Sequence, residues 1–234
     1  MPLDLRAASA YTVPTDGGTV KQFVPPAAVV KRTAAEAART RQAILTAART
    51  SFAEHGFAGV STTAIAGEAG VTRGALYHHF GDKHELFRAV FVAIEHELND
   101  SVVAAARAES NSLAAFVAGC AAWLDFAVRP DYQRIAVVDA PAVLGAAEWH
   151  EIDAGIGLAS MEAGLAALAA DGVLSRSPSR SLAVLLFGAL TDAGLSLARG
   201  DGPTRGELLE EFVSLVTGTN GARTRARRPA RRGR

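Results

Sequence analysis

Apolar residues recur at helical spacing along most of the chain. In the first such stretch they fall on one face of a helix, at Ile44, Leu45, Ala48 and Phe52. A longer apolar stripe predicts a helix from Lys83 to about Ala106. Further helices are expected near 112–128, 131–138, 148–170, 179–199 and 204–217. No segment shows the alternation typical of a half-buried strand, so the pattern predicts an all-α protein.

Local signals set the expected helix boundaries. Thr33 and Glu36 have capping-box spacing, so the first helix is expected to begin there, and Gly56 is expected to end it. A break over Pro141–Gly145 is expected to separate the helix near 131–138 from the next one. These boundaries predict that a flexible extension precedes the first helix.

Two short helices joined by a glycine turn are predicted between Thr62 and Phe80. Gly70 supplies the turn, and the apolar positions that would lock the helices together are Ile65, Ala66, Ala69, Val71, Leu76 and Phe80. This arrangement is typical of a helix-turn-helix unit. The residues left facing outward are Thr72, Arg73, Gly74, Ala75, Tyr77, His78 and His79. Their hydroxyl, guanidinium and imidazole groups suit phosphates and base edges, although Arg73 could also be a solvated surface charge.

The stretch from Arg41 to Phe91 resembles the TetR-type bacterial transcriptional regulators. The similarity includes Thr62-Thr63-x-Ile65-Ala66-x-x-Ala69-Gly70-Val71-Thr72-Arg73-Gly74-x-Leu76-Tyr77-x-His79-Phe80. It implies a three-helix DNA-binding domain followed by an all-α ligand-binding and dimerisation domain. The DNA-binding residues that we expect are Thr62, Thr72, Arg73, Gly74, Tyr77, His78, His79 and Lys83. Among these, the resemblance implies that Thr72, Arg73 and Gly74 face base edges. It implies that Tyr77, His78, His79 and Lys83 approach phosphates.

Charge is unevenly distributed although the 234 residues carry no net charge. Residues 31–90 hold eight basic and five acidic residues, a net charge of +3. Residues 91–222 hold seven basic and seventeen acidic residues, a net charge of −10, and the last twelve residues add seven arginines. An acidic body with basic ends indicates that the ends meet a polyanion. The arginine tail could strengthen nonspecific DNA binding or simply be a solvated appendage.

The expected location is the cytoplasm. The only cysteine, Cys120, excludes an internal disulfide, and its apolar neighbours indicate a buried side chain rather than a redox sensor. The longest apolar run, Leu182 to Phe187, is too short to span a membrane, and the N-terminus lacks the apolar core of a secretory signal. We therefore expect no membrane segment.

The sequence contains no motif for catalysis or for binding a metal or cofactor. His78, His79, His84 and Glu85 lie close in sequence, but no His-Glu pair continues as HExxH. No P-loop or GxSxG sequence occurs, and the glycines near Gly157 follow no predicted strand. The sequence therefore predicts neither an enzyme nor a bound metal or cofactor.

The second half of the chain holds the expected effector site. Aromatic and polar residues that could line a cavity there are Trp123, Phe126, Asp139, Trp149, His150, Met161 and Phe187. The alternative is that each aromatic is simply core, and Asp139 would need a partner if buried. The aromatic residues mildly favour a hydrophobic or aromatic small molecule.

The predicted organisation has four parts: an extension (1–32), a DNA-binding domain (33–82), a ligand-binding and dimerisation domain (83–218) and an arginine-rich tail (219–234). Helices 179–199 and 204–217 should pair in a homodimer, because their apolar surface exceeds what one core can cover. The expected function is a ligand-responsive repressor that binds a pseudo-palindromic operator. The alternative is a helical small-molecule-binding or scaffold protein without specific DNA recognition.

Overall fold

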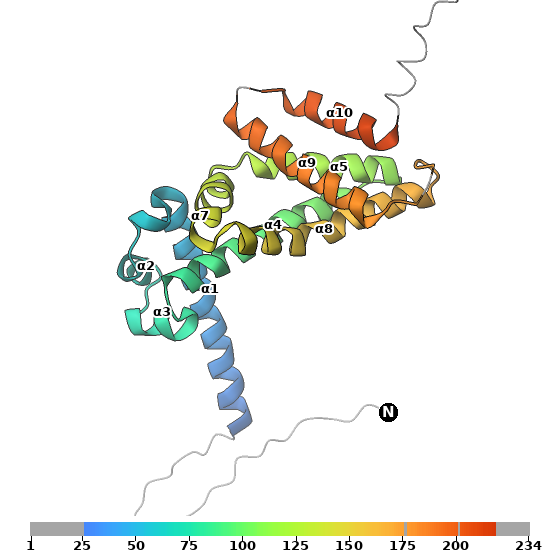
Figure 1. The fold of residues 1–234 in the computed structure, drawn as a ribbon. Coiled ribbons are helices and arrows are strands. Elements are labelled where there is room, and N and C mark those ends of the chain that lie inside the picture. The colour runs from blue at the N-terminus through green and yellow to red at the C-terminus, as the bar shows by residue number, and fades with distance from the viewer. Residues whose placement is uncertain (1–25, 176, 201, 219–234) are drawn as a thin grey trace, which may run out of the picture.

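The structure is a computed structural model that describes residues 26–175, 177–200 and 202–218, with side chains from residue 33 onward. The described residues form α-helices, one π-helical segment (η1) and no strand, which confirms the predicted all-α class (Figure 1). The elements in chain order are α1 (Pro26–Gly59), α2 (Thr62–Glu68), α3 (Arg73–Phe80), α4 (Lys83–Arg107), α5 (Ser112–Ala127), α6 (Pro130–Tyr132), η1 (Gln133–Asp139), α7 (Ala140–Leu144), α8 (Ala146–Ala170), α9 (Arg180–Arg199) and α10 (Arg205–Thr217).

The second half of α1 packs with α2, α3 and the start of α4 around a small apolar core. Its fully buried side chains include Ile44, Phe52, Ile65, Leu76 and Phe87. Short polar side chains start each following helix: Ser61, Thr72 and Asp82 accept hydrogen bonds from backbone N–H groups at the starts of α2, α3 and α4. These caps fix where the short helices begin and therefore how α3 is presented.

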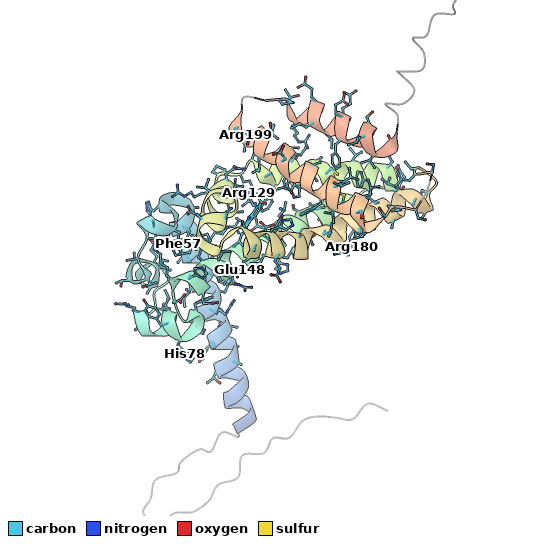
Figure 2. The ribbon with its side chains drawn as sticks, in the orientation of Figure 1. Phe57, His78, Arg129, Glu148, Arg180 and Arg199 are labelled. Carbon is cyan, nitrogen blue, oxygen red and sulfur yellow. The ribbon has the colours of Figure 1, made fainter. Side chains whose placement is uncertain are left out.

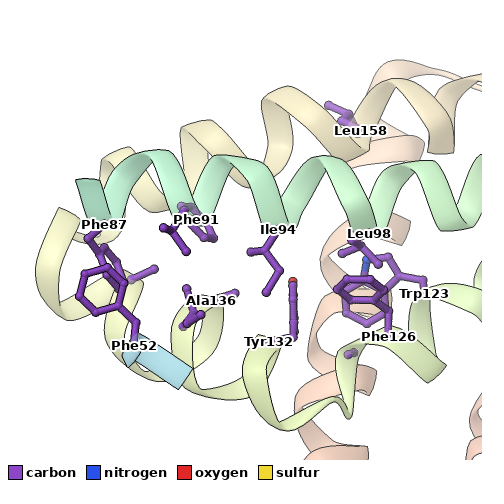
Figure 3. Close-up of a cluster of buried hydrophobic side chains, with 14 of the residues drawn as sticks. Phe52, Phe87, Phe91, Ile94, Leu98, Trp123, Phe126, Tyr132, Ala136 and Leu158 are labelled. Carbon is purple, nitrogen blue, oxygen red and sulfur yellow. The ribbon is translucent and has the colours of Figure 1, made fainter. Parts of the chain in front are cut away.

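Helix α4 runs through both halves of the molecule. One face carries Phe87, Phe91, Ile94 and Leu98, which continue from the first core into the second (Figure 3). In the second half α4 packs with α5 and α8, α9 packs on α5 and α8, and α10 lies against α5 and α9 (Figure 1). A change at the far end of α4 can therefore reach the first core without crossing a flexible linker.

Helix α1 begins earlier than the capping signal at Thr33 and Glu36 predicts. It starts at Pro26, and its N-terminal half projects away from the rest of the molecule (Figure 1). Alanine-rich sequence with no glycine or proline continues from there to Gly56, where a φ of 71° interrupts the helix. The expectation of a flexible segment up to residue 32 is thus wrong for residues 26–32. Residues 1–25 and 219–234 lie outside the described part.

The helical path continues through Pro141, where the sequence predicts the start of a break. The chain stays helical from Pro130 to Leu144 through η1, and Gly145, with a φ of 84°, ends it. Pro141 lies inside this path, two residues after the end of the π-helical segment η1. The chain therefore breaks at Gly145, the C-terminal end of the expected Pro141–Gly145 break, and not at the proline.

Two described helices, α8 and α9, are long and apolar enough to cross a membrane by length and composition, and the bent pair of α5 with 130–144 would add a third if it were one span. This is a statement of length and composition alone, and it does not contradict the expectation of no membrane segment. Their mean hydropathy is high because alanine and leucine occupy many positions of both helices. In this fold α8 and α9 pack on each other and on α5.

Candidate nucleic-acid interface

Helix α3 presents most of the predicted DNA-binding residues on the surface of the first domain. Thr72, Arg73, Gly74 and His78 are exposed, and Tyr77 and His79 are half-buried. His78 lies at the end of the molecule opposite Arg180 of the second domain (Figure 2). The structure therefore brings these polar groups together on one helix at one end of the molecule.

A hydrogen-bonded chain joins α2 to α3 beneath this surface. The Tyr77 hydroxyl lies 3.0 Å from Thr62 Oγ1, and Arg73 Nη2 donates to the same hydroxyl oxygen at 3.3 Å. The Arg73 guanidinium also lies over the Tyr77 ring, 5.2 Å from its centroid. The hydrogen bond with Thr62, and then that from Arg73, lower the pKa of Tyr77 below its ordinary value. Thr62 is buried, and its hydroxyl holds the Tyr77 side chain against α2.

Gly74 sits in α3 where the fold does not require a glycine. An added Cβ would meet only Thr72 Oγ1, at 3.9 Å, and the backbone does not have a positive φ there. Glycine inside a helix costs roughly 0.5–1 kcal/mol relative to alanine. A glycine at such an exposed position is consistent with close approach of another molecule.

Two further cations lie near α3. The Lys83 ammonium at the start of α4 lies 4.3 Å from the centre of the Phe57 ring, and desolvation lowers its pKa. Arg41 of α1, which the sequence prediction did not include, places its guanidinium 4.8 Å from the centre of the Phe80 ring at the end of α3. The sequence places Arg41 on the polar face of α1, but its contact with the Phe80 ring is visible only in the packed structure.

The predicted effector residues divide into two groups. Trp123, Met161 and Phe187 line a cavity of about 40 Å³ between α4, α5, α8 and α9. The other four lie outside it. Phe126 packs against Tyr132, the Trp149 indole donates to Ala136 O at 2.9 Å, and His150 is exposed.

Asp139 is the fourth residue outside the cavity, and it lies at the contact between the domains. Its Oδ2 accepts a hydrogen bond of 2.7 Å from the Phe57 backbone N–H and pairs with Arg134 at 3.3 Å. The sequence analysis expected that Asp139 would need a partner if buried. The structure supplies one from the DNA-binding domain.

Two acidic residues that the sequence prediction omitted line the cavity. Glu95 and Asp153 are only 3% and 5% exposed. Burial, and then the proximity of Asp153, raise the pKa of Glu95 to about 8, against a hydrogen bond with Tyr132 that lowers it. Burial raises the pKa of Asp153 to about 6. A signal was present, because Glu95 lies within the apolar stripe between Ile94 and Leu98.

Ion pairs join α1 to the second domain. Arg49 pairs with Glu97 of α4, and its Nη2 lies 2.7 Å from Asp131 Oδ2. Arg129 completes the group, 2.7 Å from Glu97 and 2.9 Å from Asp131. The arginines lower the pKa of Glu97 and, against its burial, that of Asp131. Each of these four side chains is only partly exposed, so the group links α1, α4 and α6.

No group of three or more metal-binding side chains occurs within the described ranges. The arrangement is thus a polar helix surface, a small interior cavity and a set of contacts between them. A short helix, a glycine turn and a second exposed helix on a helical second domain define a helix-turn-helix DNA-binding protein.

Comparisons with known proteins agree with this class, and the chain belongs to the TetR family of transcriptional regulators. Residues 44–90 match the family model described as bacterial regulatory proteins, tetR family, and residues 113–219 match the tetracyclin repressor-like C-terminal domain. A TetR-family regulator from Pectobacterium atrosepticum is 33% identical, with 79% of this chain and 94% of that chain covered and a TM-score of 0.63.

Other relatives match more narrowly. The HTH-type transcriptional repressor BepR of Brucella suis is 45% identical over 78 residues, which are 33% of this chain and 37% of that protein. The chain thus spans little more than a third of the length of this curated relative. The Bacillus subtilis regulator FadR, solved in complex with stearoyl-CoA, is 17% identical with a TM-score of 0.59, covers 75% of this chain and 97% of its own, and shows the fold alone.

Proposed function

We propose that the protein is a cytoplasmic, ligand-responsive transcriptional repressor that binds a pseudo-palindromic operator as a homodimer. The observation that carries this proposal is the exposed surface of α3, where Thr72, Arg73 and Gly74 project beside the anchored Tyr77. Hydroxyl and guanidinium groups at the N-terminus of a recognition helix can read base edges in the major groove. The naming of BepR as a repressor supports repression as the direction of control.

The apolar surface of α9 and α10 supports the homodimer. Leu185 of α9 is 70% exposed and Leu215 of α10 is 63% exposed, and the two line one groove between these helices. Large apolar side chains in such a cluster are typical of an interface. Two-fold pairing through these helices would give two copies of α3, suited to half-sites about 34 Å apart.

Replacing Leu185 with arginine is expected to shift the protein from dimer to monomer. The side chain is exposed in a single chain, so the change should leave each chain folded while it places a charge in the interface. Sedimentation equilibrium measures the mass. Val138→Arg is the matched control, because Val138 is 57% exposed on η1, away from α9 and α10. A dimer unaffected by Leu185→Arg would place the interface elsewhere.

The route proposed for ligand control is α4 together with the contacts beside it. The cavity residue Glu95 follows Phe91 of the first core by about one turn of α4. On the other side, η1 connects Tyr132 to Asp139, which holds the Phe57 backbone. A ligand that displaces α4 or η1 would change the position of α3 relative to its symmetry mate, and it acts only through its different affinity for the two arrangements.

The test of this function is binding to the intergenic DNA upstream of the protein's own gene. Electrophoretic retention should be stronger for this DNA than for a shuffled duplex of the same composition, and it should require both half-sites. Equal binding to both duplexes, or to neither at low salt, would contradict the proposal. The alternative, a ligand-binding or scaffold protein without DNA recognition, predicts that neither duplex is retained.

A further inference from the structure

The interior cavity of the second domain has an acidic end. Glu95 of α4 and Asp153 of α8 both line it, and its other walls include Trp123, Phe187 and Leu98. None of the described residues that line this cavity is basic. Figure 3 shows that the Tyr132 hydroxyl points toward α4 between Ile94 and Leu98, which fits its hydrogen bond with Glu95.

Asp153 has no hydrogen-bond partner among the described residues, unlike Glu95 and Asn99, which line the same cavity. Glu95 has Tyr132, and Asn99 accepts a hydrogen bond from Ser160 at 2.7 Å. Asp153 is only 5% exposed, and the one charge interaction that favours its ionised form is with exposed His150, three positions earlier on α8. A buried carboxylate without a partner is costly, so the site favours a group that supplies positive charge.

A larger apolar pocket adjoins the acidic cavity. It has a volume of about 310 Å³ and lies between α4, α5 and α8, lined chiefly by small and apolar residues such as Gly119, Cys120 and Phe116. Met161 lines both spaces, and Ser160 of the larger pocket bonds to Asn99 of the smaller one. Methionine has three rotatable side-chain bonds, so a rotamer change at Met161 can join the two.

We propose that the effector of this protein is an organic cation whose charged end occupies the Glu95–Asp153 cavity and whose apolar or aromatic body fills the adjoining pocket past Met161. This rests on the proposed ligand-responsive function and names the chemical class that the site takes. The aromatic rings of Trp123 and Phe187 also favour a cation, since the face of such a ring attracts positive charge. Arg107, the basic residue lining the larger pocket, lies twelve positions along α4 from Glu95, roughly 18 Å away.

The Glu95–Asp153 pair carries about one negative charge near neutral pH, which matches a ligand with one positive charge. The raised pKa of Glu95, about 8, keeps this carboxyl neutral near neutral pH, whereas the pKa of Asp153, about 6, leaves it ionised. The groups that face the pair are Tyr132 from α6 and, near Asp153, His150 from α8. A bound cation favours the charged form of Glu95, so binding should release part of a proton and tighten as pH rises toward 8.

Calorimetric titration of the full-length protein with phenylbutylamine and with phenylbutanol tests the proposal. The two probes share one apolar body and differ in an ammonium against a hydroxyl. We expect the amine to bind about tenfold or more tightly, and Asp153→Asn to remove this preference. Glu151→Gln is the matched control, because Glu151 is an exposed acid on the same helix.

The outcomes separate the ligand class from the function. If the alcohol binds as well as the amine, if neither binds, or if Asp153→Asn keeps the preference, the proposed cation site is wrong. Operator retention measured in the same samples decides the rest. Specific retention without amine binding leaves the DNA-binding function intact, and failure of retention itself refutes that function. If the amine binds but does not weaken retention, it is not an effector and the proposal fails on that ground.

Discussion

Substitution of Thr72, Arg73 and Tyr77 together by alanine is expected to abolish sequence-specific operator binding. Arg73 loses its base or phosphate contact, and loss of Tyr77 removes the anchor that joins Arg73 to Thr62. With about 1–3 kcal/mol for a base-reading arginine and similar losses for its neighbours, the affinity should fall by on the order of a thousandfold. Fluorescence anisotropy on operator and shuffled duplexes measures the loss.

Two single variants test whether the loss of binding comes only from a weakened α3 or from a change in overall charge. Thr72 caps α3, so its loss alone weakens the helix by about 1 kcal/mol. Arg73→Ala leaves the cap in place and should still weaken operator binding. Arg180→Ala removes an equally exposed positive charge at the far end of the molecule and should leave operator affinity almost unchanged (Figure 2). Equal effects of the two arginine variants would mean that only overall charge matters.

Gly74→Ala separates folding from recognition. Alanine should stabilise α3 by roughly 0.5–1 kcal/mol, since its methyl group meets nothing closer than Thr72 Oγ1 at 3.9 Å. The same methyl group should weaken operator binding if DNA approaches the helix here. A rise in melting temperature with a fall in operator affinity is the expected combination, and unchanged affinity would remove Gly74 from the interface.

The sequence was sufficient to predict those parts of the fold that rest on local signals. The caps at Thr72 and Asp82 and the turn glycine Gly70 act within a few residues, so α3 and the start of α4 lie where they were expected. The prediction that α1 begins at Thr33 is wrong, because a capping-box spacing can also occur inside a helix. Nothing in a local pattern distinguishes these two cases when strong helix formers continue on both sides.

The contacts between domains could not be predicted, because they join residues far apart in the chain. The sequence predicts that Asp139 needs a partner if it is buried, but this partner, the Phe57 backbone N–H, lies 82 positions away. The cavity position of Glu95 could not be predicted for a related reason, although its place in an apolar stripe is visible in the sequence. A charged residue within an apolar stripe suggests a tolerated edge of the helix, and only the packing of α8 shows that Asp153 faces the same interior space.

Glu95→Gln is expected to make the protein more stable at alkaline pH. The pKa of Glu95 rises from an ordinary value of 4.5 to about 8 on folding, so the folded state binds more protons than the unfolded state between these values. The free energy of unfolding contributed by this group is therefore full below pH 4.5 and is lost as pH rises to about 8. A glutamine cannot ionise, so the variant should exceed the wild type above this range by on the order of 3 kcal/mol.

Denaturant unfolding at several pH values measures this difference, and the window from about pH 6 to 8 isolates it. Glu97 and Asp131 have lowered pKa values, so their stabilisation is complete below this window. Asp153 has a pKa of about 6, so its own loss of stability is nearly complete at the lower end of this window. Asp153→Asn should therefore show a smaller gain in stability than Glu95→Gln. Exposed Glu151→Gln should follow the wild type throughout. If Glu95→Gln also loses stability between pH 6 and 8 as the wild type does, Glu95 is not the group that titrates, and the interior of this domain carries its charge elsewhere.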